Sequence, residues 1–152
     1  NRRSRGLGDV YKRQVKELTV INEMAMTVGL VMLTIGNFLG GMWANESWGR
    51  YWGWDPKETW ALISIMIYAF VIHMRLVPGL RNRLVFNIAS VLAFGSILMT
   101  YFGVNFYLAG LHSYAKDDQE ISINYILTAL AIITTLSVFA SLKYRKFYTK
   151  SN

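Results

Sequence analysis

Four long runs of apolar residues, separated by short polar links, dominate the sequence. Each run approaches or exceeds the ~20 residues that a helix needs to cross the hydrocarbon core of a bilayer. The runs cover Asn22–Trp43, Thr59–Val77, Leu84–Phe106 and Ile121–Leu142. This pattern predicts an all-α polytopic membrane protein with about four transmembrane helices.

The composition agrees with a membrane protein, since 53% of the 152 residues are hydrophobic. The first run is too long for a signal peptide and is not followed by a small-residue cleavage site. The chain has no cysteine, so it supplies no thiol of its own. Any thiol chemistry in which it takes part needs a partner that brings the thiols.

The positive charges predict how the helices are oriented. The N-terminal segment, the link between the second and third runs, and the C-terminal segment carry 13 of the 16 lysines and arginines. Only Arg50, Lys57 and Lys116 lie in the other two links. The positive-inside rule therefore predicts a multi-pass membrane protein with both termini in the cytoplasm. Because the basic excess is an orientation signal, we expect no nucleic-acid binding.

The apolar runs and the charges divide the chain into three segments. Residues 1–14 are polar and basic without periodicity, and we expect a loop, a disordered leader or foreign sequence there. Residues 15–145 form the predicted membrane domain. Residues 146–152 form a basic cytoplasmic tail suited to contact with lipid headgroups.

Two local motifs concern the first two helices. Gly36 and Gly40 have a small-xxx-small spacing, which predicts close packing against a neighbouring helix. The sequence "DPKE" predicts a helix start at the outer surface: Asp55 as the N-cap, Pro56 at the first helical position and Glu58 completing a capping box. Capping alone explains these three residues.

All five tryptophans lie between Trp43 and Trp60. Tryptophan and tyrosine gather at membrane surfaces without any ligand, which is one explanation. Such a belt, however, would spread over all helices and both surfaces, and here the third and fourth runs contain no tryptophan. We therefore expect the outer link to form an aromatic surface for a flat ligand.

The two histidines suggest which ligand. His112 follows the third run, on the same predicted side as the tryptophans, and Gly110 before it permits close approach of the backbone to a bulky ligand. His73 lies about 20 Å from Trp60 along the second helix at ~1.5 Å per residue, deep in the membrane. Imidazole is a common axial ligand of haem iron, so we expect His112 to be such a ligand. For His73, a structural hydrogen bond across helices is an equal alternative.

The stretch "WGRYWGWDPKETWALI" closely resembles the tryptophan-rich WWD signature of haem-handling proteins in cytochrome c maturation, and it is most similar to the CcsA/ResC type of the system II cytochrome c synthase. "GLHSY" resembles that family's outer histidine segment, and His73 matches its membrane histidine. The resemblance runs from about residue 15 to about residue 145. The signature positions are Trp48, Trp52, Trp54, Asp55 and Trp60.

The resemblance implies that haem b is bound at the signature and presented to the Cys-x-x-Cys-His motif of apocytochrome c, whose thiols add to the vinyl groups. His112 would be an axial ligand of the outer site, and His73 a ligand where haem enters from the cytoplasmic side. Only one histidine of each expected pair is present. We therefore expect a fragment of a longer protein that works with a CcsB/ResB-type membrane partner, fused or separate.

Other functions fit parts of the sequence. A CcmC-like protein would deliver haem to a chaperone without forming a bond to the cytochrome. A transporter or proton relay would use His73 but leave the tryptophans without a role, and the sequence shows no inverted repeats. A purely structural membrane subunit would bind no haem. The signature favours a haem lyase subunit, and we assign no catalytic acid or base.

Overall fold

The computed structural model describes residues 2–108, 110–111 and 123–148. Its long helices are α1 (Arg2–Trp48), α2 (Pro56–His73), α3 (Arg83–Leu98) and α5 (Ile123–Tyr148), and the described residues contain no strand. A π-helical turn, Met99–Gly103, continues α3 into the short helix α4 (Val104–Tyr107). Two 3-10 turns, Met74–Leu76 and Pro78–Leu80, connect α2 to α3.

Four helical segments are long and apolar enough to cross a membrane, as predicted. They cover Gly8–Trp48, Pro56–Leu76, Arg83–Tyr107 and Asn124–Lys146. The third combines α3, the π turn and α4 in one continuous path. The prediction of an all-α polytopic membrane protein is therefore confirmed.

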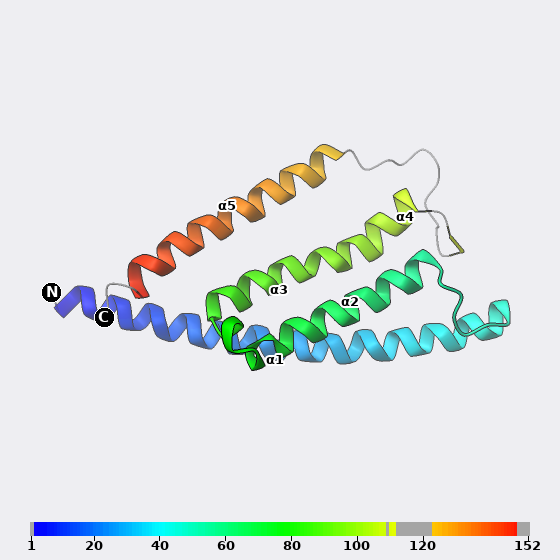
Figure 1. The fold of residues 1–152 in the computed structure, drawn as a ribbon, viewed down its shortest axis with the longest axis horizontal. Coiled ribbons are helices and arrows are strands. Elements are labelled where there is room, and N and C mark those ends of the chain that lie inside the picture. The colour runs from blue at the N-terminus through cyan, green and yellow to red at the C-terminus, as the bar shows by residue number, and fades with distance from the viewer. Residues whose placement is uncertain (1, 109, 112–122, 149–152) are drawn as a thin grey trace.

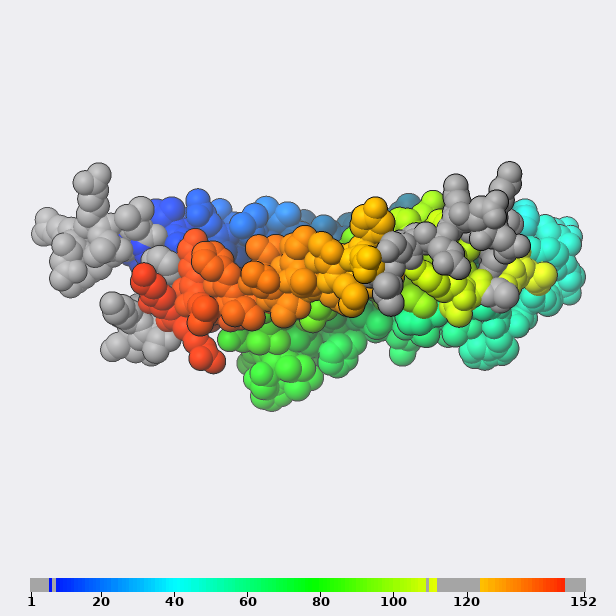
Figure 2. Space-filling model, turned by 90° about the horizontal axis from the view of Figure 1, so that it is seen from above, coloured from blue at the N-terminus to red at the C-terminus, as the bar shows by residue number. Residues whose placement is uncertain are grey.

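The helices run back and forth in sequence, so that the start of α1 and the end of α5 lie at the same end of an elongated bundle (Figure 1; Figure 2). We call this the basic end and define it by residues 8–20, 73–84 and 140–148. The opposite end, defined by residues 43–60 and 104–111, is the tryptophan end. Lys143 Nζ on α5 lies 5.6 Å from the centre of the Tyr11 ring on α1, which joins the two helices at the basic end.

The buried core is small and lies where α1, α2 and α3 meet. It contains Met26, Val71, Met74, Phe86 and Ala93. Many large apolar side chains elsewhere are exposed, among them Phe38 on α1 and Phe70 on α2. Lipid tails are as apolar as these side chains, so a membrane helix need not hide them inside the protein.

A polar network ties α1 to α3 within this apolar bundle. The Asn22 amide donates hydrogen bonds to Asn87 Oδ1 (3.1 Å) and Ser90 Oγ (2.7 Å). The Asn87 amide in turn donates to Thr19 Oγ1 (2.8 Å). The polar residues of the third run thus face protein, as their presence in an apolar helix indicates.

An ion pair at the basic end joins α1 to the turn after α2. Arg75 Nη1 lies 2.6 Å and 2.9 Å from the two carboxylate oxygens of Glu23. The Arg75 side chain is 62% exposed, so we assign the pair little free energy and treat it as a local tether.

The glycines of α1 correct one prediction. A Cβ atom added at Gly29, Gly36 or Gly40 would meet nothing within 4 Å. The predicted close packing at Gly36 and Gly40 is therefore wrong for the helices that the structure describes. Small-residue spacing permits close approach but does not by itself bring a neighbouring helix into contact.

Helix α1 also begins earlier than the apolar pattern indicates. The structure describes residues 2–14 as helical, where the sequence analysis expected a loop, a disordered leader or foreign sequence. A helix that begins at Arg2 spans 47 residues, about 70 Å at ~1.5 Å per residue, which is far longer than a bilayer requires. Apolar periodicity marks the part of a helix that faces lipid or protein, and it leaves a polar extension unmarked.

Replacing Asn87 with alanine should lower the free energy of unfolding by about 1 kcal/mol, because it removes hydrogen bonds between two helices in a membrane. Unfolding in mixed micelles by a denaturing detergent measures the change. Thr27→Ala is a control, because the Thr27 hydroxyl bonds the Glu23 carbonyl within α1 at 2.8 Å. Equal losses in the two variants would contradict the network's role.

Candidate functional site

The chain reverses direction between α1 and α2 at the tryptophan end, and two residues there have positive φ angles. Gly49 (φ 70°) ends α1, and its amide donates to the Asn45 carbonyl at 2.8 Å. Glycine is the residue best suited to this left-handed cap. Among the described residues, Trp54, which directly precedes the N-cap of α2, is the non-glycine residue with a positive φ angle (58°).

Trp54 combines a strained backbone with an exposed ring. A bulky residue at positive φ costs about 1–3 kcal/mol. Its side chain is 71% exposed, so burial of the indole within the described chain offsets little of this cost. Strain that folding does not require is typical of positions where a protein presents a side chain for function.

The indoles are arranged as two edge-to-face pairs. Trp43 and Trp48 have ring centres 5.0 Å apart at 79°, and Trp52 and Trp54 have centres 5.7 Å apart at 90°. Trp60 lies one turn into α2, and its carbonyl accepts a hydrogen bond from the Ser64 hydroxyl (2.9 Å) and lies 3.2 Å from Thr100 Oγ1. The rings within each pair are therefore not coplanar, and a flat ligand would meet single faces and edges.

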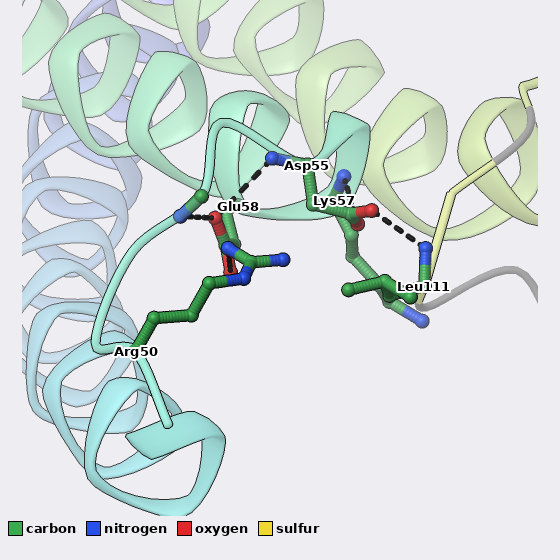
Figure 3. Close-up of polar contacts among 6 residues, drawn as sticks. Arg50, Asp55, Lys57, Glu58 and Leu111 are labelled. Carbon is green, nitrogen blue, oxygen red and sulfur yellow. Dashed lines mark hydrogen bonds and ion pairs between the residues drawn. The ribbon is translucent and has the colours of Figure 1, made fainter. Parts of the chain in front are cut away.

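Asp55 caps α2 as the sequence predicted, and the capping box is complete (Figure 3). Asp55 Oδ2 accepts from the Lys57 amide at 3.3 Å, and Glu58 Oε2 accepts from the Asp55 amide at 3.2 Å. Pro56 stands at the first helical position, where its missing N–H costs nothing. A cap of this kind stabilises a helix by about 1 kcal/mol.

The cap also orders the tryptophan-bearing link. Glu58 Oε2 accepts from the Gly53 amide at 2.7 Å, and Arg50 Nη1 lies 3.7 Å from Glu58 Oε1. A Cβ atom at Gly53 would collide with the Arg50 guanidinium, so this glycine leaves the space that Arg50 occupies. The Arg50 guanidinium carbon also lies 6.0 Å from the centre of the Trp48 ring. Arg50 thus connects the end of α1 to the start of α2, a role that sequence reasoning did not assign.

A second contact of Asp55 reaches the segment after α4. Its Oδ1 atom accepts a hydrogen bond of 2.7 Å from the amide of Leu111, 56 residues later. Gly110 packs against Asp55 and Pro56 (Figure 3 shows the Leu111 contact). Sequence reasoning expected Gly110 to make room for a bulky ligand. In the structure it makes room for the start of α2.

A cavity of about 420 Å³ lies beside the link, between α1 and the start of α2. This volume is within the range of ligand sites. Its lining consists of Met32, Leu33, Gly36, Asn37, Gly40, Gly41, Ala44, Tyr51, Trp52, Lys57, Glu58, Ala61 and Thr100. The glycines of α1 therefore border open space next to one signature tryptophan. Lys57, one of the lining residues, donates a hydrogen bond from Nζ to Asn105 Oδ1 at 3.2 Å.

The π turn places Thr100 at this cavity. Its hydroxyl donates to the Ser96 carbonyl (2.8 Å) and contacts Ser64 Oγ (3.0 Å) on α2. Ser64 is fully buried. π turns are frequent at functional sites because they shift one helical turn relative to its neighbours. The sequence analysis did not predict the π turn.

Of the two histidines in the sequence, the structure describes His73. His73 ends α2 at the basic end, so the structure does not bring it together with the tryptophans. Its ring is exposed, and Nδ1 lies 2.8 Å from the Ala69 carbonyl. His112 lies outside the described residues. Within the described part of the chain, no group of three or more histidine, cysteine, aspartate or glutamate residues is arranged to hold a metal ion.

Comparison with known proteins identifies the family. The family described as "Cytochrome C assembly protein" matches residues 8–112, beginning inside the segment that the sequence analysis set aside. The protein NrfI of Wolinella succinogenes is 60% identical over 106 residues, which are 70% of this chain and 12% of that protein. "Cytochrome c biogenesis protein CcsA" of Prochlorococcus marinus is 48% identical over 99 residues, 65% of this chain and 32% of that protein.

The same similarity extends to a plant protein. CcsA of Cuscuta reflexa is 46% identical over 109 residues, 70% of this chain and 34% of that protein. The chain thus spans between about one eighth and one third of the length of these relatives. The resemblance is confirmed at the level of the family: the chain belongs to the cytochrome c assembly protein family.

Proposed function

We propose that this chain is the haem-handling membrane part of a cytochrome c haem lyase. It binds haem b and presents it at the outer face of the bacterial inner membrane for covalent attachment to apocytochrome c. The observation that carries the proposal is the exposed Trp54 indole, held at positive φ directly before the Asp55 cap in a member of the cytochrome c assembly family.

The aromatic link suits the face of a porphyrin. Trp54 and Tyr51 are both strongly exposed, at 71% and 64%. Aromatic rings bury a large area against a flat apolar partner and also accept edge-to-face contacts. The adjacent cavity, with Trp52 in its lining, extends this surface into the membrane. We propose Trp48, Trp52, Trp54 and Trp60 as the haem-contacting residues of the signature.

Lys57 gives this surface a positive charge at its edge. Lys57 is one of the residues that line the cavity, and its ammonium group donates to Asn105 Oδ1 at 3.2 Å. The ring faces of a porphyrin are apolar, whereas its propionates are anionic. The tryptophan link and the cavity therefore offer complementary chemistry to both parts of the substrate.

His73 has the hydrogen bond that prepares an imidazole for iron. When Nδ1–H donates to the Ala69 carbonyl at 2.8 Å, the lone pair remains on Nε2. The ring is exposed on the surface of the described helices, so a ligand or a further helix reaches it from outside this chain. We propose His73 as one ligand where haem enters from the cytoplasmic side, with the second ligand supplied by a CcsB/ResB-type partner.

His112 completes the proposal at the outer side as an axial ligand of the presented haem. The apocytochrome supplies the two thiols of its Cys-x-x-Cys-His motif. Each S–H adds across one vinyl C=C bond, so that sulfur bonds to one carbon and the hydrogen ends on the other. This chain lacks cysteine and contributes position, because it holds the vinyl groups near the thiols.

The charge distribution supports the orientation. The start of α1, the turns between α2 and α3 and the end of α5, which carry most of the described lysines and arginines, lie at the basic end, and the link between α1 and α2 lies at the other end (Figure 1). The positive-inside rule assigns the basic end to the cytoplasm. Haem bound at the tryptophan end then faces the compartment in which cytochrome c matures.

Replacing His112 with alanine in the full-length protein should lower haem content and cytochrome c yield about tenfold, the factor that ~1.4 kcal/mol of lost binding produces. Exogenous imidazole should restore the Soret band, because it replaces the missing axial ligand. The absorption spectrum of protein purified in detergent measures this. An unchanged spectrum and an unchanged yield would refute the assignment, and loss of yield with normal haem content would favour a step after binding.

Trp54→Gly tests the aromatic surface without adding backbone strain, because glycine accepts a positive φ at no steric cost. We expect a three- to tenfold loss of haem retention, about the 0.5–1.5 kcal/mol of an aromatic contact. Retention after detergent washing measures it. Trp43→Ala is the matched control, since Trp43 lies on α1 and is also largely exposed. Equal retention in both variants would remove the argument for Trp54.

His73→Ala should reduce the haem content of freshly isolated membranes about tenfold while leaving haem added from the outer side able to bind. The difference arises because His73 lies at the opposite end of α2 from the tryptophans. Haem supplied to inverted and right-side-out vesicles, followed by its absorbance, separates the two routes. An equal loss from both sides would show that His73 supports the fold as a whole.

A further inference from the structure

We propose that Asp55 is a positioning residue: its carboxylate clasps the backbone of segment 110–111, which directly precedes the proposed haem ligand His112 in the sequence, against the start of α2. The inference rests on the proposed function and deepens it. It replaces the expectation that Asp55 contacts haem. The acid is only 7% exposed and is already hydrogen-bonded to backbone amides, so it has little surface to offer a ligand.

The clasp uses both carboxylate oxygens. Oδ2 accepts from the Lys57 amide (3.3 Å) and caps α2, while Oδ1 accepts from the Leu111 amide (2.7 Å), as Figure 3 shows. The first contact is local and the second joins segments 56 residues apart. Hydrogen bonds from backbone amides to a carboxylate are stronger than neutral ones, and the positive end of the α2 dipole favours the charge.

Gly110 makes the contact possible sterically. A Cβ atom there would lie 2.9 Å from Pro56 Cδ and 3.0 Å from Asp55 Cγ, and it would also collide with Asp55 Oδ1. A larger residue at position 110 would therefore push the segment away from the cap. The contact depends on a carboxylate on one side and on the absence of a side chain on the other.

The contact bears on the proposed outer ligand through the chain itself, because Leu111 is covalently joined to His112. The same capping box orders the link that carries Trp52 and Trp54, through Glu58 and the Gly53 amide. The start of α2 thus contacts both the aromatic link and segment 110–111, which precedes His112 in the sequence.

Asp55→Asn separates the clasp from the cap. Asparagine is itself a preferred N-cap, so α2 still begins at the same place. Its side chain, however, has one acceptor oxygen, and its NH2 group cannot accept a hydrogen bond. One of the two amides, Lys57 or Leu111, then loses its partner. The contact with the Lys57 amide is local and closes a short loop at low entropic cost, whereas the contact with the Leu111 amide joins segments 56 residues apart. We therefore expect the variant to keep the Lys57 contact and to lose the Leu111 contact.

Hydrogen–deuterium exchange of the full-length protein in detergent measures the release. In Asp55→Asn we expect the Leu111 amide to exchange about tenfold faster or more, as the loss of a charge-assisted hydrogen bond requires. Glu58→Gln is the matched control, because glutamine preserves the capping box and Glu58 bonds the Gly53 and Asp55 amides instead. Unchanged exchange in Asp55→Asn, or equal acceleration in Glu58→Gln, would overturn the clasp.

Gly110→Ala disrupts the same contact sterically, because the added Cβ atom would collide with Asp55 and Pro56. It should accelerate exchange of the Leu111 amide by a similar factor. Gly79→Ala is its control, because a Cβ atom at Gly79 would meet nothing within 4 Å. If Gly110→Ala exchanged like the parent, the close approach of segment 110 to the cap would be refuted. If Gly79→Ala matched Gly110→Ala, the effect would come from glycine replacement in general, which also overturns the proposal.

The haem spectrum then tests positioning itself. Asp55→Asn should lose the Soret signature of the outer ligand about as fully as His112→Ala, and added imidazole should restore it in both. Faster Leu111 exchange with a normal spectrum, in a protein whose spectrum His112→Ala does alter, would overturn the positioning role. A spectrum that His112→Ala leaves unchanged would instead refute the proposed haem ligand, while the exchange experiment would still decide whether Asp55 holds segment 110–111.

Discussion

The hydrogen-bonded start of α2 is the constraint on which the geometry of the tryptophan end depends. Asp55 and Glu58 accept hydrogen bonds from amides of the first turn, of the preceding link and of the segment after α4. Backbone amides near a membrane surface need partners, and two carboxylates at one helix N-terminus supply several at once. Two links from different parts of the chain are thereby anchored to one helix start.

The rest of the bundle is held together by a small buried core and a few polar contacts. Its buried core is small, because exposing apolar side chains to lipid costs little free energy, whereas exposing them to water is unfavourable. Hydrogen bonds between Asn22, Asn87 and Thr19 hold α1 to α3 where apolar contact discriminates poorly. The open space beside Gly36 and Gly40 fits a chain that spans only part of the length of its relatives. Such a bundle is held by a few polar contacts and leaves faces available to other helices.

The candidate site shows the same division between scaffold and presented groups. Arg50 and Gly53 fit against each other and keep the link compact, whereas Trp54 stands exposed at positive φ. A scaffold held by backbone hydrogen bonds can carry strain at one residue, because the neighbouring contacts fix the conformation. At the other end the Ala69 carbonyl likewise fixes one nitrogen of the His73 ring, and the other nitrogen is the one that we propose as a haem ligand.

The sequence by itself determined the four apolar helices, the capping box at Asp55 and the family, because lipid imposes a length on every span and a cap is made by residues three apart. It did not determine that Gly36 and Gly40 border a cavity, that Gly110 packs on Pro56, or that Asp55 bonds the Leu111 amide. Nor did it indicate the π turn or the backbone of Trp54. These features depend on which segments meet across the bundle, and local pattern carries no information on contacts between residues 56 positions apart; only the packed tertiary structure decides them.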